Sequence, residues 1–89
     1  MTLQESINAG QRAAKLLIDT TFIDAVERTK ARLYAEWCSS EDVTHREEIH
    51  AAVSGCQEFV RTLQIIVGDG EVAEHDLREI ERERDRDKS

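Results

Sequence analysis

The strongest constraint on the fold of this 89-residue chain is an unbroken heptad pattern between Thr44 and Gly68. Apolar residues recur there with alternating gaps of four and three positions, which places them along one side of a single α-helix. Three further apolar residues widen that side, as is typical of a helix that faces the core of a bundle. The pattern therefore predicts a long helix with the seam residues Ile49, Val53, Cys56, Val60, Leu63 and Val67 and the flanking residues Ala52, Phe59 and Ile66.

Both ends of this seam helix carry terminal signals. Thr44 and Glu47 have the spacing of a capping box, in which side chains satisfy free N–H groups of the first turn. Gly68 suits the position just after a helix, and the two residues that follow extend it into a tight break. Asp69 would then cap a final helix over residues 70–86, in which apolar residues are few.

Two helices are predicted before the seam helix. Residues 3–18 space apolar and small residues as a helix does, and Gly10 indicates that this helix packs either very closely or weakly. Asp19 is a suitable N-cap for a second helix over residues 20–38. Residues 39–43 are few enough for an antiparallel helix–helix turn. The apolar stripe of the second helix, which faces the seam, includes Phe22, Val26, Leu33 and Trp37.

Together these elements predict an all-α fold, an antiparallel helical hairpin with shorter N- and C-terminal helices. Residues 1–80 would form a single helical domain, and residues 81–89 a charged tail that frays, because its favourable and unfavourable charge pairs nearly cancel. The seam is small for a chain of this length, so we expect oligomerisation or docking on a partner to complete the core. Phe59 and Ile66 point away from the facing stripe and mark the flank where a terminal helix or another chain would dock.

Composition limits the classes of partner. A net charge of −7 disfavours direct binding to nucleic acid or to anionic membranes, which favour basic surfaces. The N-terminus lacks the pattern of a signal peptide, and no stretch has the length of a membrane span, so we expect a cytoplasmic location. Cys38 and Cys56 lack zinc-site spacing, and the hairpin would hold them too far apart for a disulfide.

The best candidate for chemistry is the pair Glu47 and His50. Their Glu-x-x-His spacing is used by di-iron carboxylate bundles, and it places both side chains on one helix face. Folding the hairpin about residue 41, however, brings Arg32 opposite His50, which disfavours a metal cation there. We therefore predict no catalytic residues, no cofactor and no metal site, so the chain is expected not to be an enzyme. Whether Glu47 and His50 nevertheless bind a metal is left open by the sequence.

Three stretches resemble a type of small acidic helical-hairpin protein from tailed phages and prophages. They are the run LLIDTTFIDA, the run REEI, and the run from Leu63 to Leu77. Thr20 stands where that family often has proline, and Val67 stands at its isoleucine position. The matching positions, which are structural and not catalytic, are Leu16, Leu17, Asp19, Phe22, Ala25, Arg46, Glu47, Ile49, Leu63, Gly70, Ala73 and Leu77.

This resemblance implies a helical hairpin with a docked C-terminal helix and a phage origin, with no assigned activity. With the seam, it predicts a non-enzymatic phage protein, virion-associated or an assembly adaptor, that acts through helix–helix protein interaction. Its partner would be a second copy or a larger phage structural protein, in the host cytoplasm or in the virion. The alternative is a small acidic phage inhibitor of a host nucleic-acid-binding or defence protein. The predicted interaction seam comprises Phe22, Val26, Leu33, Trp37, Ile49, Val53, Cys56, Phe59, Val60, Leu63, Ile66 and Val67.

Overall fold

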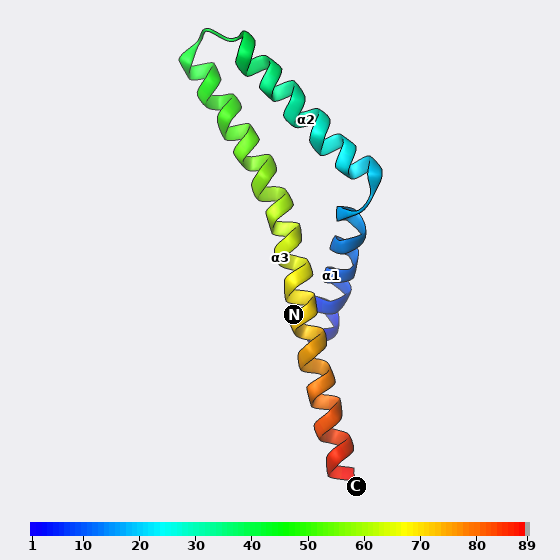
Figure 1. Cartoon of the computed structure of the whole chain (residues 1–89). Coiled ribbons are helices and arrows are strands. Elements are labelled where there is room, and N and C mark those ends of the chain that lie inside the picture. The colour runs from blue at the N-terminus through cyan, green and yellow to red at the C-terminus, as the bar shows by residue number, and fades with distance from the viewer. Residues whose placement is uncertain (89) are drawn as a thin grey trace.

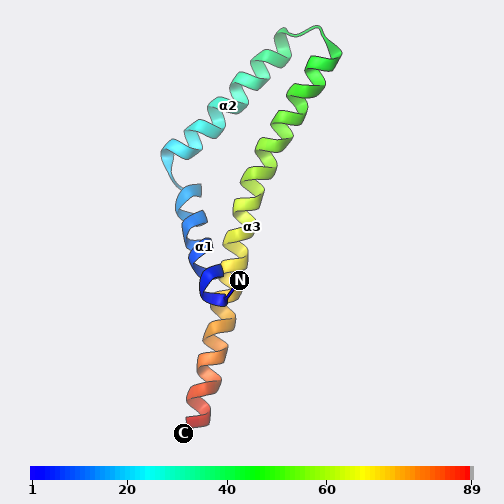
Figure 2. The same ribbon diagram turned by 180° about the vertical axis from the view of Figure 1, so that it is seen from behind.

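The computed structural model describes residues 1–88, and these form three helices: α1 (Leu3–Leu17), α2 (Thr20–Ser39) and α3 (Val43–Lys88). The described residues contain no strand, so the predicted all-α class is confirmed. α1 and α2 follow one another along one side, and α3 returns antiparallel to both as one long helix (Figures 1 and 2). The hairpin therefore has one broken arm and one continuous arm.

The two helices of the broken arm begin at the predicted places. The Thr2 hydroxyl accepts a hydrogen bond from Glu5 N–H at 3.1 Å and caps α1. The Asp19 carboxylate accepts one from Phe22 N–H at 2.9 Å and caps α2, as the sequence predicts. These side chains satisfy N–H groups that have no partner in the first turn of a helix.

The start of α3 differs from the prediction. The helix begins at Val43, and Asp42 is its N-cap, because the Asp42 carbonyl accepts from Arg46 N–H and its carboxylate accepts from Thr44 N–H, both at 3.0 Å. The capping box of Thr44 and Glu47 is therefore wrong. An aspartate two residues earlier caps at least as well as a threonine, so the helix gains its first turn upstream.

The predicted break at Gly68 is also wrong, and with it the separate C-terminal helix over residues 70–86. α3 is helical throughout, and every glycine keeps a negative φ. The reason lies in packing: a Cβ on Gly70 would lie 3.0 Å from the Gly10 Cα atom, and one on Gly10 would lie 3.2 Å from the Ile66 carbonyl oxygen. Gly70 therefore permits a close helix approach, which outweighs its helix-propensity cost of about 1 kcal/mol. Of the two alternatives for residues 3–18, very close packing is the one found.

Beyond the α1 contact, α3 continues alone (Figure 1). Ala73 is buried and Leu77 is half-buried, whereas residues 80–87 are exposed. The predicted division into a domain over residues 1–80 and a fraying tail over 81–89 stays a prediction, and Ser89 lies outside the described residues.

The hairpin is a single layer of helices. It measures 72 × 25 × 14 Å, and its radius of gyration is 19.9 Å, against about 12 Å for a compact domain of this length. Its accessible surface is 6917 Å², against about 5,300 Å² for a typical folded monomer of the same mass. Domains usually bury their apolar faces between two layers. Here the buried apolar residues are Ile7, Ala13, Leu33, Ile49 and Ala73.

Candidate interaction surfaces

The predicted interaction seam lies between the two arms of the hairpin, but most of it remains accessible. Leu33 and Ile49 are buried, and Trp37 and Phe59 are exposed. Cys56, which the sequence placed deep in the seam, is only half-buried. The half-buried members are Phe22, Val26, Val53, Cys56, Val60, Leu63, Ile66 and Val67.

The first surface is a groove between α2 and α3 near the turn, which we call the tip groove. It has a volume of ≈ 400 Å³, and Tyr34 and Trp37 on its rim are 68% and 40% exposed. A second hollow of ≈ 270 Å³ shares Lys30 with it and continues toward α1. The tip groove is lined by Lys30, Leu33, Tyr34, Trp37, Ile49, His50 and Val53.

Arg46 fixes the turn at the end of the tip groove. Its guanidinium carbon lies 4.5 Å from the ring centroid of Trp37, and its Nε donates to the Ser40 carbonyl oxygen at 2.7 Å. A guanidinium stacked on an indole is attracted by the ring's negative face, and its aliphatic stem adds apolar contact. Arg46 therefore holds the Trp37 ring at the mouth of the groove.

Tyr34 and Cys38 lie one turn apart on α2, beside the same groove. A hydrogen bond between their side chains raises the pKa of the Tyr34 hydroxyl above its ordinary value of 10.0, and the charge of Cys38 and partial burial act in the same direction. The neutral, hydrogen-bonded phenol therefore persists to higher pH than in an isolated tyrosine.

The second surface, the Phe59 patch, comprises Leu16, Phe22, Phe59, Leu63 and Ile66. The Phe22 and Phe59 rings tilt against each other with centroids 6.2 Å apart, yet Phe59 remains 56% exposed. A shallow hollow of ≈ 260 Å³ next to them is lined by Leu63 and Ile66 of α3 and by four α1 residues, Ala9, Arg12, Ala13 and Leu16. The flank predicted from Phe59 and Ile66 is therefore covered by α1 at Ile66 and open at Phe59.

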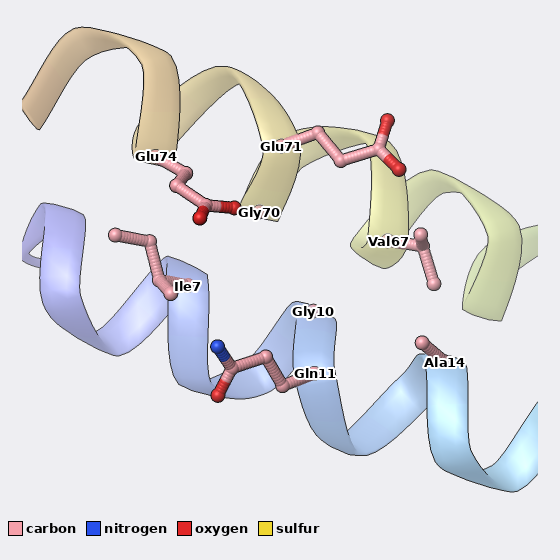
Figure 3. A pocket seen from close by; sticks show the side chains of 8 residues that line it. All are labelled: Ile7, Gly10, Gln11, Ala14, Val67, Gly70, Glu71 and Glu74. Carbon is pink, nitrogen blue, oxygen red and sulfur yellow. The ribbon is translucent and has the colours of Figure 1, made fainter. Parts of the chain in front are cut away.

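The third hollow, at the crossing of α1 and α3, is narrow. Its volume is ≈ 160 Å³, and Figure 3 shows Ala14 and Val67 facing each other near the point where Gly10 and Gly70 bring the ribbons together. Ile7, also part of its lining, is buried. This crossing is a packing contact, and its volume lies below the usual range of ligand pockets.

The candidate metal pair does not gather further ligands. Glu47 and His50 are exposed, and both line a hollow of ≈ 560 Å³ near the turn, together with Trp37 and Val43. Arg32, predicted to lie opposite His50, forms an ion pair with Glu36 at 3.1 Å. Across residues 1–88, no three His, Cys, Asp or Glu side chains converge as metal ligands would. Cys38 and Cys56 are free thiols.

Sequence reasoning missed Tyr34, which lines the tip groove, and Arg46, which stacks on Trp37 at the end of the groove. Tyr34 was assigned no role, and Arg46 appeared only as a matching position of the phage resemblance. A signal for Arg46 was present, because folding the chain about residue 41 places position 37 opposite position 45. An arginine beside that position faces the only tryptophan of the chain.

Comparison with protein families, with curated proteins and with solved structures finds no match to this chain. None of the helices within residues 1–88 combines the length and the apolar character that a membrane span needs.

Proposed function

We propose that this chain is a non-enzymatic interaction protein of a tailed phage, virion-associated or an assembly adaptor, which binds a helix of a larger phage structural protein in the tip groove. The observation that carries the proposal is the open apolar groove of Leu33, Tyr34, Trp37, Ile49 and Val53 on a single helical layer. The phage setting comes from the resemblance of residues 16–77.

The composition of the groove fits protein recognition better than chemistry. Tyrosine and tryptophan are the residues that most often dominate binding energy at interfaces. Tyr34 and Trp37 flank an apolar floor, and Lys30 and His50 supply polar groups at the edge. An apolar centre with a polar rim is the usual anatomy of a protein–protein interface.

The length of the groove fits a helix as the ligand. Three hollows follow one another along this side, joined through Trp37 and Lys30, and they extend on α3 from Val43 to Gln64. At 1.5 Å per residue this stretch is about 32 Å long, which matches an amphipathic helix of about 20 residues.

The inhibitor alternative receives less support from the surface charges. Charge mimicry of nucleic acid needs acidic side chains that form a continuous face. Here basic residues neutralise acids along the helices, with ion pairs Arg28–Asp24 at 2.8 Å, Arg32–Glu36 at 3.1 Å and Arg78–Glu74 at 2.8 Å.

The test is mass spectrometry of particles from the phage or prophage that carries the gene, with wild type compared with Tyr34→Glu. Because Tyr34 is 68% exposed, this substitution should spare the fold and remove one aromatic anchor. We expect wild type in particles or in a complex with a head or tail protein, and at least about tenfold less of the variant. Ile65→Glu, at a 53% exposed residue outside the groove lining, should associate as wild type does. Absence of wild type from particles and from complexes with head and tail proteins would refute the proposal.

A further inference from the structure

We infer that a second copy of this chain covers the Phe59 patch, so that two hairpins pack face to face as a homodimer. This surface shares no residue with the lining of the tip groove, although Phe22 belongs both to the patch and to the hollow that continues the groove toward α1. Val60 lines the hollow that continues the tip groove. Phe59 is the residue before it, so its side chain points about 100° away from that hollow around α3. Failure of the dimer therefore leaves the proposed function standing, and the reverse also holds.

The first argument is the uncharged strip of α3 on which Phe59 lies, bordered by Arg12 of α1 and by the ion pair of Arg61 with Glu58. The neighbours of Phe59 on the helix surface, three, four and seven positions away in either direction, are all uncharged, although 35% of the chain is charged. They are Ala52, Gly55, Cys56, Thr62, Leu63 and Ile66. A basic partner, which the net charge of −7 would attract, finds no acid at these six positions, and the nearby Glu58 is already paired with Arg61. An equally uncharged patch is a suitable partner, and an identical copy supplies one.

The second argument is the shape of the patch. Gly55 lies one turn before Phe59, and a Cβ built on it meets no atom within 4 Å. The exposed Phe59 ring therefore stands next to a stretch of helix surface that carries no side chain and has open space above it. A two-fold axis between these positions sets the ring of each copy over the bare backbone at Gly55 of the other. Such an isologous contact requires a surface that is complementary to itself.

The third argument is area. The hairpin fits within an outline of 72 × 25 Å, so half of its length offers at most about 900 Å² of one face to a second copy. Stable protein interfaces bury about 800 Å² per partner. The monomer's surface of 6917 Å² exceeds that of a typical folded protein of this mass by about 1,600 Å², which is enough to supply this area. A second copy is present wherever the chain is expressed, and it provides the second layer of helices that the single hairpin lacks.

The test is sedimentation equilibrium of the full chain together with circular dichroism. Wild type should sediment at twice 10.2 kDa, and its Tm should rise with protein concentration. Phe59→Glu should sediment at 10.2 kDa. Gly55→Gln should do the same while keeping its helical signal, because the new side chain occupies the space that the partner's Phe59 ring needs and also raises helix propensity.

Matched controls locate the contact. Ile65→Glu places the same charge at a similarly exposed apolar residue of α3, and Gly68→Gln fills another helical glycine with open space around its Cβ. Both controls should remain dimeric. If Phe59→Glu loses its helical signal, it has unfolded and does not report on the dimer. The sedimentation of Gly55→Gln then provides the test. Wild type at 10.2 kDa with a Tm independent of concentration overturns the inference, and so does a dimeric Gly55→Gln.

Discussion

Helix α1 packs on α3 at the crossing, and helix α2 packs on α3 at the tip near the turn. The two contacts fill the space between the helices in opposite ways. At the crossing, glycines on both helices let the backbones approach so closely that a single added Cβ would lie 3.0 Å from the facing Cα atom. At the tip, aromatic side chains line the space between the helices, and Leu33 is the buried residue of α2.

This difference shows what a single layer of helices can and cannot bury. Small residues complete their contacts between two helices alone, because little side chain projects beyond the pair. Large residues such as Tyr34 and Trp37 project above the layer, and only another layer can cover them. The crossing is thus the self-sufficient part of the molecule, and the tip is the part prepared for a partner.

Truncation of matched isoleucines gives the largest expected effect. Ile7 at the crossing and Ile49 at the tip are 7% and 4% exposed. Because the close crossing cannot collapse around a cavity, Ile7→Ala should lower the free energy of unfolding by about 3–4 kcal/mol. Ile49→Ala should cost about 2 kcal/mol, since its half-open surroundings can rearrange. Urea denaturation at one protein concentration measures both, and Ile65→Ala is the exposed control. Equal losses for Ile7→Ala and Ile49→Ala would contradict the comparison.

Two glycine substitutions in α3 test the crossing, because they should change the free energy of unfolding in opposite directions. Gly70→Ala forces backbone against backbone, at a cost of about 1–3 kcal/mol, of which up to about 1 kcal/mol is offset by helix propensity. Gly68→Ala meets open space in the same helix and should stabilise by up to about 1 kcal/mol. Thermal denaturation should therefore move the two Tm values in opposite directions. A stabilised Gly70→Ala would show that the approach is not as close as the structure has it.

The hairpin itself was predictable from sequence because its signals are local. Asp19 caps α2 as expected, and the heptad spacing of residues 49–67 correctly gave the inward side of α3. Gly70 was misread because a glycine that ends a helix and a glycine that admits another helix look alike along the chain. What distinguishes them is the facing residue Gly10, sixty positions earlier, which no local pattern links to it.

The candidate surfaces were predicted in part for a related reason. Periodicity identifies which residues share a face, so Phe59 was correctly placed on an outward flank. It cannot tell how far apart two helices lie, and therefore it did not predict that Trp37 would be exposed and Ile49 buried. The stacking of Arg46 on Trp37 depends on the turn geometry, which in turn depends on the cap moving to Asp42.

Loss of the Arg46 side chain should give an intermediate effect confined to the tip. Arg46→Ala removes the contact with the Trp37 ring and the hydrogen bond to the Ser40 carbonyl oxygen, at a combined cost of about 1–2 kcal/mol. Arg46→Lys should restore little, because an ammonium lacks the planar stacking surface. The fluorescence of the single tryptophan reports the local change, and an emission spectrum unaltered in Arg46→Ala would contradict the contact.

The smallest effect concerns the pair Tyr34 and Cys38 at the rim of the tip groove. Cys38→Ala removes the hydrogen bond and the charge that raise the Tyr34 pKa, so this pKa should fall toward 10.0. The chain has one tyrosine, so phenolate absorbance follows its titration directly.

A raised pKa in the folded state means that the folded state keeps the Tyr34 proton to higher pH than the unfolded state does. The stability from this contact is therefore complete below pH 10 and declines as pH rises through the folded pKa. Cys38→Ala should weaken that decline while leaving stability at neutral pH close to that of wild type. An unchanged Tyr34 titration would mean that the rim of the tip is too open to hold the pair together.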